Sequence, residues 1–389
     1  MPVAGRQKPL RPPDRSPLGP KERDAVAVLL DAVDDAQRNG VDADARFPWD
    51  LHVLKSVGRK AYVAFVISTE AVTMSLKSGT LYVRAVSRPR PGGVAVEQHS
   101  DIRGWLRGAQ SLARAPETVT VGAGEMPVGG PAVSSGRRSI QAPAEASTLL
   151  ELQRRAAERQ KARAEEERRA LDERDPSLFP FEEYYFFESR TPRSDDRRLL
   201  GRAMAIAPGE YDLYVALLDR AHIKDAKPVV LERRLTIPDF WNDELRLSSL
   251  ILTSDMKMLP TPLPKKERAE QPFTFGLASA VPNLTRTFST KDVLTILYQI
   301  CNYGAPGAEL RADYRFYHVD GARKLFNGTP PQELTDDDLP PTVGWETQAF
   351  AMQLVPLAPF PPGKYELEVT VNDRTTRSTA VGVAAFTVK

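Results

Sequence analysis

A chain of 389 residues is long enough for two or three domains, each with its own hydrophobic core. Its formal net charge of +2 is close to zero for this size, which argues against nucleic acid as a partner. The single cysteine, Cys301, excludes an internal disulfide framework and a cysteine-based zinc site within one chain. No apolar run approaches the ~18 residues of a membrane span, so no transmembrane segment is expected.

Residues 1–46 combine a basic, Pro-rich segment with one short helix. Residues 1–20 are expected to be disordered, because they contain basic residues and prolines but no apolar run. The same lack of an apolar run means that no signal peptide is visible. From Lys21 to Arg38 the apolar residues recur at helical spacing and the pattern closes toward Gly40, which predicts an amphipathic helix. This helix is either a docking element or a lone cap.

Residues 47–256 are predicted to form a first β-sandwich domain. Runs rich in Val, Tyr and Phe, separated by turn residues, predict its strands. These runs are His52–Lys55, Ala61–Ser68, Leu81–Val86, Tyr184–Phe187, Leu199–Ile206, Tyr211–Leu217, Val229–Ile237 and Leu245–Leu252.

A long insertion at about 92–177 interrupts this first domain. Most of it is rich in Gly, Ala, Pro and Ser without periodicity, which indicates a flexible excursion. Residues 148–175 instead predict a charged helix, in which eight basic residues are balanced by eight acidic ones. Balanced charge argues against a nucleic-acid arm. The helix is either solvated or binds a protein partner.

Residues 257–270 contain Pro260, Pro262 and Pro264 before two lysines, which predicts a stiff linker. A second β-sandwich domain is then predicted over residues 271–389. Its best strand patterns are Val293–Asn302, Leu310–His318, Ala349–Leu357, Tyr365–Val371 and Val381–Val388.

The two series of strands share an internal repeat of the form P-G-x-Y-x-L-x-V-x-x-x-D. The first copy contains Pro208, Gly209, Tyr211, Leu213, Val215 and Asp219. The second copy aligns with it without a gap and contains Pro362, Gly363, Tyr365, Leu367, Val369 and Asp373. Because each copy follows one apolar strand and precedes another, the repeat indicates that one structural module is used twice.

The spacing within the repeat predicts a hairpin turn followed by a sandwich strand. Proline fixes φ and glycine opens conformations closed to other residues, so the pair favours a sharp turn. Tyr365, Leu367 and Val369 then share one face of a strand, while Glu366 and Glu368 share the other. We therefore expect the tyrosines to face a core and the repeat to be structural.

No motif of the sequence predicts a catalytic, cofactor-binding or metal-binding residue. The four histidines follow no metal-ligand spacing; they are His52, His99, His222 and His318. Glu182 and Glu183 are adjacent on a predicted strand and so point to opposite faces. The aspartates at 336–338 lack calcium-loop spacing and are expected in a solvated loop, with a weak calcium site as the alternative. Cys301 lies in a strand pattern typical of a buried, unreactive thiol.

Several phrases of the sequence resemble known proteins. A tyrosine at the start of a sandwich strand is similar to the tyrosine corner of immunoglobulin-like domains, in which its hydroxyl bonds back to the chain. The phrases Phe179–Glu182, Leu200–Ala203 and Ala207–Ala216, with the C-terminal Pro-Gly-Lys-Tyr, resemble the tandem sandwich regions of exported bacterial proteins. These are proteins related to von Willebrand factor A or carrying the GWxTD motif. At Gly344–Gln348 this chain has Gln where that motif has Asp.

Together these patterns predict a mainly β protein of two immunoglobulin-like sandwich domains, with a long, partly helical and partly disordered insertion in the first. The hypothesis for function is a non-enzymatic binding or structural protein that acts through an unidentified protein partner or surface. One alternative is a carbohydrate-binding module that uses the strand aromatics Tyr184–Phe187, and another is a hydrolase accessory subunit. The resemblance implies a periplasmic or secreted location, while the sequence leaves compartment and oligomeric state open.

Overall fold

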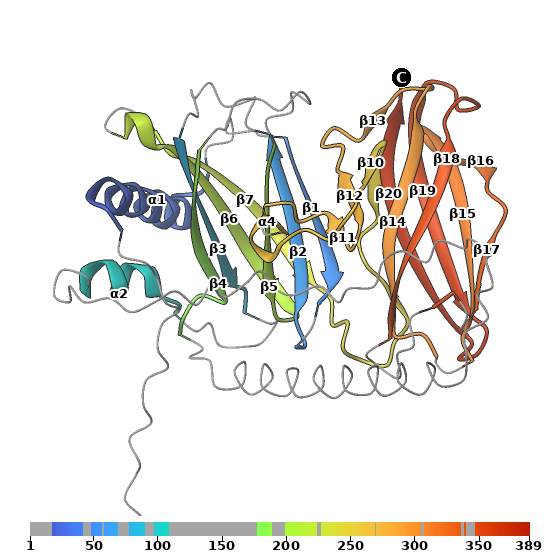
Figure 1. The fold of residues 1–389 in the computed structure, drawn as a ribbon, viewed down its shortest axis with the longest axis horizontal. Helices are drawn as coiled ribbons and strands as arrows, with labels where there is room; N and C mark the ends of the chain where they lie inside the picture. The colour runs from blue at the N-terminus through green and yellow to red at the C-terminus, as the bar shows by residue number, and fades with distance from the viewer. Residues whose placement is uncertain are drawn as a thin grey trace, which may run out of the picture.

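The computed structural model describes residues 18–41, 48–56, 58–68, 78–89, 97–108, 177–188, 199–223, 227–268, 270–304, 307–335, 338–339 and 347–389. Over these ranges the chain is mainly β, in several sheets whose facing sides enclose apolar cores, consistent with a β-sandwich (Figure 1). None of the helices in these ranges has the length and apolar character needed to cross a bilayer. The charged helix predicted at 148–175 lies outside the described residues, as do residues 1–17.

The first sheet pair consists of a three-stranded and a four-stranded antiparallel sheet. Its two sheets face each other across a core of alternate strand residues, among them Val63, Phe65, Leu213 and Val215. The strand orders are β1-β2-β5 and β4-β3-β6-β7. The strands are β1 (Trp49–Lys55), β2 (Ala61–Ser68), β3 (Ser78–Ser87), β4 (Phe181–Glu188), β5 (Leu199–Ile206), β6 (Gly209–Asp219) and β7 (Val229–Ile237).

Two helices cover the outer face of the four-stranded sheet, α1 (Pro20–Asn39) and α2 (Asp101–Gly108). Pro20 suits the first turn of α1, and the Glu22 carboxylate accepts the Gly19 amide at 2.9 Å. The apolar stripe of α1, which includes Leu29 and Val33, packs on residues of β3 and β6. The amphipathic helix predicted from the sequence is thus a docked element, and the insertion also contributes a packed helix.

The second sheet pair repeats this arrangement with additions. One sheet has the order β18-β14-β8, with β9 also paired to β14. The other has the order β13-β20-β19-β15-β16, with β17 paired to β15, and β13 runs parallel to β20. The strands are β8 (Arg246–Leu247), β9 (Ile251–Thr253), β13 (Thr287–Phe288), β14 (Val293–Cys301), β15 (Glu309–Asp320), β16 (Ala322–Gly328), β17 (Gln332–Thr335), β18 (Gln348–Pro356), β19 (Gly363–Asp373) and β20 (Ser378–Val388).

The boundary predicted at residue 256 is wrong. The predicted strand at 245–252 does not belong to the first sheet pair, because β8 and β9 pair with β14. The physical reason is burial: Leu245, Leu250 and Leu252 belong to the core of the second sheet pair. A strand pattern shows that a segment is buried, but not in which of two sheets it lies.

The stiff linker predicted at 257–270 is also wrong. Residues 255–281 form a small three-stranded sheet of β10 (Asp255–Met258), β12 (Ala278–Val281) and β11 (Thr274–Phe275), with the short helix α4 (Lys265–Arg268) in the loop. Phe273 and Phe275 insert into an apolar cluster that also contains Tyr62 of β2 and Leu297 of β14. This sheet therefore helps to join the two sheet pairs face to face, as Figure 1 shows.

Candidate functional site

The two copies of the repeat occupy equivalent corners of the fold. The Tyr211 hydroxyl donates to the Ala207 carbonyl at 2.9 Å, and the Tyr365 hydroxyl donates to the Pro361 carbonyl at 2.7 Å. The predicted hairpin is wrong, however, because β5 and β6 lie in opposite sheets, as do β18 and β19. The Pro-Gly turn carries the chain across the sandwich, and the tyrosine hydroxyl fixes that crossing.

The remaining repeat residues also act in the scaffold. A Cβ at Gly363 would lie 2.4 Å from the His318 ring, so the close approach of the ring requires glycine. The Asp373 carboxylate accepts the Gly304 and Thr375 amides, and Asp219 accepts the Ala221 amide. Leu213, Val215, Leu367 and Val369 are core residues of the two sheet pairs.

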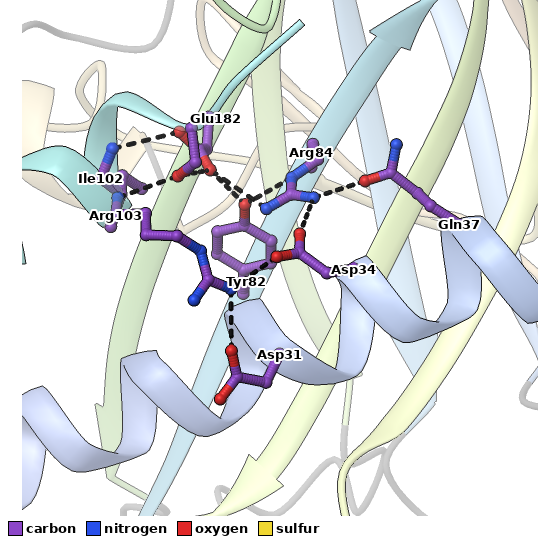
Figure 2. A network of polar contacts seen from close by, with 9 residues as sticks. Asp31, Asp34, Gln37, Tyr82, Arg84, Ile102, Arg103 and Glu182 are labelled. Atoms are coloured by element: carbon purple, nitrogen blue, oxygen red, sulfur yellow. Dashed lines mark hydrogen bonds and ion pairs between the residues drawn. The ribbon is translucent and has the colours of Figure 1, made fainter.

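A buried polar network lies beneath α1 and α2, on the outer face of the four-stranded sheet (Figure 2). At its centre is Arg84 of β3, which is 0% exposed. The Arg84 guanidinium donates to Asp34 of α1 at 2.6 Å and also to Gln37 of α1. It lies over the Phe179 ring at 4.3 Å, a cation–π contact. Arg84 therefore joins the strand to α1 within an apolar surface.

Glu182 of β4 joins the same network to α2. Its carboxylate accepts the Tyr82 hydroxyl, the Ser100 hydroxyl at 2.6 Å and the Ile102 amide at 3.3 Å. The amide belongs to the first turn of α2, where a negative charge is favourable. Arg103 of α2 then reaches α1, with Asp31 at 2.8 Å and Asp34 at 2.6 Å.

The electrostatics of this network favour structure over catalysis. Burial and the Glu182 carboxylate raise the pKa of the Tyr82 hydroxyl well above its usual value, so this group stays protonated. Burial opposes the charge of Arg84, but Tyr82, Asp34 and Glu182 raise its pKa above the usual value. The carboxylates of Asp34 and Glu182 are both engaged, and the network presents neither an activated nucleophile nor a free base. It is a clamp that docks two helices on a sheet.

A second polar cluster joins the two sheet pairs. The Gln299 side chain accepts the Lys55 amide at 2.7 Å and donates to the Lys55 carbonyl at 3.3 Å. The Lys55 ammonium donates to Asn302 at 2.7 Å and lies 4.8 Å from the centre of the Trp241 ring. Nearby on β1, Asp50 contacts His52 at 3.0 Å and Arg286 at 2.9 Å.

The other residues considered for chemistry are also in structural positions. Cys301 is buried, and burial raises the pKa of its thiol to about 12, which makes it unreactive. No group of acidic, histidine or cysteine residues in the described ranges has an arrangement that could hold a metal ion. The aspartates at 336 and 337 lie outside those ranges. Glu182, which is adjacent to Glu183 on β4, belongs to the helix clamp.

The aromatic residues of β4 do not form an exposed row. Tyr185 and Phe187 pack on the core between the sheets of the first pair, whereas Tyr184 and Phe186 pack on the cluster beneath α1. Alternation along the strand thus divides them between two cores.

The outer faces of the two larger sheets differ in what covers them. Val230 on β7 packs against the α1 cluster. Val230 lies opposite Ala216 of β6, and Val381 of β20 lies opposite Thr370 of β19, the residue that the repeat aligns with Ala216. Val381 is 56% exposed. Val383, also on β20, is 55% exposed.

No described helix covers the outer face of β15, β19 and β20, and the two valines of β20 are exposed there beside polar residues such as Arg315 and Glu368. We call this surface the open face.

The sequence patterns did not predict the helix clamp or the open face. They also did not predict the junction, the polar cluster of Lys55, Gln299 and Asn302 that joins the two sheet pairs. The helix clamp combines residues from four segments, around positions 34, 84, 102 and 182, which only the fold brings together. One local signal existed: Arg84 interrupts the apolar run Leu81–Val86, and a charge in a strand buried on both faces needs a partner.

Comparison with known proteins does not identify a family. The sequence matches no protein-family model, and no curated protein is detectably similar to it. Among solved structures it resembles Escherichia coli alpha-2-macroglobulin activated by porcine elastase, with 10% identity over 90% of this chain and a TM-score of 0.19. Red sea bream transglutaminase has 8% identity over 92% of the chain, with a TM-score of 0.19.

A calcium-binding mutant of Bacteroides uniformis beta-glucuronidase 2 has 11% identity over 54% of the chain, with a TM-score of 0.21. The chain spans 22%, 33% and 22% of the lengths of these three proteins. At such TM-scores the resemblances carry no argument about function.

Proposed function

We propose that this chain is a non-enzymatic binding protein built from two immunoglobulin-like sandwiches. The strand orders support this architecture: β2 and β5 share one sheet while β3, β6 and β7 share the other, and β14, β18, β15, β19 and β20 follow the same scheme. The resemblance of its repeat phrases to exported bacterial sandwich proteins supports a periplasmic or secreted location.

The observation that carries the proposal is the open outer face of the second sandwich. The equivalent face of the first sandwich is covered by the chain's own helices, and Val230 packs beneath them. Val381 and Val383 on the second face remain more than half exposed. Exposed apolar residues grouped on a rigid sheet are typical of protein-interaction surfaces.

The described polar clusters favour binding over catalysis. The buried Arg84 of the helix clamp bonds to Asp34 and Glu182, and the polar cluster around Lys55 joins the two sandwiches. The division of the β4 aromatics between two cores gives the carbohydrate-binding alternative no support.

Photo-crosslinking tests the proposed surface. A photoreactive amino acid in place of Val383 should capture one defined partner in cells that naturally make the protein. The matched control is the exposed Glu232 of β7. It lies opposite Tyr214, and the repeat aligns Tyr214 with Glu368, the residue opposite Val383. If position 383 captured nothing beyond what position 232 captures, the open face would not be a binding surface.

A further inference from the structure

We propose that the partner places an acidic amphipathic helix on the open face of the second sandwich, as α1 lies on the first. The inference rests on the proposed function, because it names the kind of partner that the same face binds. Its basis is a pair of equivalent arginines, of which one bonds to a helix and the other bonds to no carboxylate in the described part of the chain.

Strand register makes Arg84 and Arg315 equivalent. Arg84 of β3 lies opposite Tyr214 of β6, and Arg315 of β15 lies opposite Glu368 of β19. The repeat aligns Tyr214 with Glu368, three residues beyond its tyrosine in each copy. Both arginines therefore project from the outer face at the same place in their sheets.

The two arginines differ in what they bond. Arg84 is buried and bonds to Asp34 and Gln37 of α1. Arg315 is exposed and makes no ion pair within the described ranges. Glu368 directly opposite bonds to other groups, since its carboxylate accepts Arg323 at 2.6 Å and the Tyr317 hydroxyl at 3.3 Å. Among the residues that the structure describes, Arg315 thus bonds to no carboxylate, at the position where α1 presents one to Arg84.

Apolar contacts beside the arginine favour a helix as the occupant. Val381 corresponds to Val230, which α1 covers, and Val383 extends the apolar strip along β20. Beyond β19, β20 pairs among the described strands only with β13 at Thr387 and Val388, so its edge is open to an added strand. Such a strand would extend the sheet in its own plane and would not lie over Arg315 on β15, two strands away. A helix whose apolar stripe borders a carboxylate meets both requirements.

The second face is also more polar than the first. Ala216 and Leu218 beneath α1 correspond to Thr370 and Asn372. We therefore expect the partner helix to bury less apolar surface than α1 does and to bind reversibly. An exposed ion pair to Arg315 then contributes mainly to specificity.

A charge-swap experiment with a peptide of the α1 sequence, Pro20–Asn39, tests the proposal. The peptide carries the stripe and the carboxylate that the second face should recognise, and its binding to the full chain can be followed by fluorescence anisotropy. Arg315→Glu should weaken binding by about tenfold, since it replaces attraction with repulsion. A peptide carrying Asp34→Arg should recover binding to the Arg315→Glu chain, and Val381→Asp should weaken binding of the original peptide.

Lys291→Glu makes the same charge change at an exposed site just before β14, which lies in the other sheet, and should leave the affinity unchanged. Absence of saturable binding at millimolar peptide would overturn the proposal, and so would binding that Arg315→Glu leaves intact. Either result could coexist with a partner captured at position 383. In that case the binding function would stand and only the helical nature of the partner would be wrong.

Discussion

At the scale of single residues, the same side chain serves different purposes in the two modules. Arg84 lies beneath helices and needs Asp34 and Glu182 to compensate its buried charge. Arg315 stands on an open face, where water compensates the charge. The difference follows from what covers each sheet, and substitution of each arginine should show it as a difference in the free energy of unfolding.

Arg84→Met is expected to lower the free energy of unfolding by about 3–5 kcal/mol, because it leaves the buried Glu182 carboxylate without its cation. Arg315→Met is the matched control and should change it by no more than about 0.5 kcal/mol. Urea unfolding followed by circular dichroism measures both. Equal effects of the two substitutions would mean that the network beneath α1 contributes no more to stability than an exposed side chain.

Acid should destabilise the protein through Asp50 at the junction between the sheet pairs. Burial alone would raise the pKa of this carboxyl, but His52 and Arg286 lower it to about 2. Because the unfolded value is about 3.9, the charged form stabilises the fold above about pH 4 and this contribution is lost as the pH falls toward 2. The stability difference between wild type and Asp50→Asn should therefore shrink by about 2 kcal/mol between pH 6 and pH 2. A difference independent of pH in unfolding titrations would contradict this assignment.

At the scale of elements, strands with at least one buried face were predictable and a fully exposed strand was not. The predicted runs at 61–68, 199–206 and 229–237 coincide with β2, β5 and β7, because alternation or continuous apolar character follows burial. All seven residues of β16 are exposed, so it carries no such pattern. Residues 257–270 were predicted as a linker because of their prolines, whereas the structure places the end of β10 and the helix α4 there. The crossing role of the Pro-Gly turn depends on which sheets its strands join, and local spacing does not show that.

The crossing element should depend on its tyrosine hydroxyl in both modules. Tyr365→Phe and Tyr211→Phe each remove a hydrogen bond to the carbonyl four residues earlier, and each should lower stability by about 1 kcal/mol. Tyr317→Phe removes a longer bond on the open face and should have a smaller effect. Thermal unfolding of the three variants compares them. A larger loss from Tyr317→Phe than from Tyr365→Phe would mean that the corner bond is unimportant.

At the scale of the whole molecule, the two sheet pairs form one layered body instead of two domains on a flexible linker. An apolar cluster containing Tyr62, Phe273 and Phe350 fills the space between them. Cys301 belongs to β14 of the second pair, yet its side chain packs in the core cluster of the first. Such a body holds the open face of the second sandwich at a fixed orientation relative to α1, which suits a protein that presents a binding surface.

The cysteine makes this coupling measurable. Its thiol is buried and its pKa is raised to about 12 by that burial, so a disulfide reagent reacts only when the junction opens. Gln299→Ala removes the paired hydrogen bonds to Lys55 and should speed labelling by about tenfold, corresponding to roughly 1.4 kcal/mol of lost junction stability. Gln353→Ala on β18 removes a half-exposed amide away from the junction and should leave the rate unchanged. If labelling of the Gln299 variant were as slow as that of wild type, the thiol would be shielded by the sandwich core alone, and the two sheet pairs could separate without exposing it.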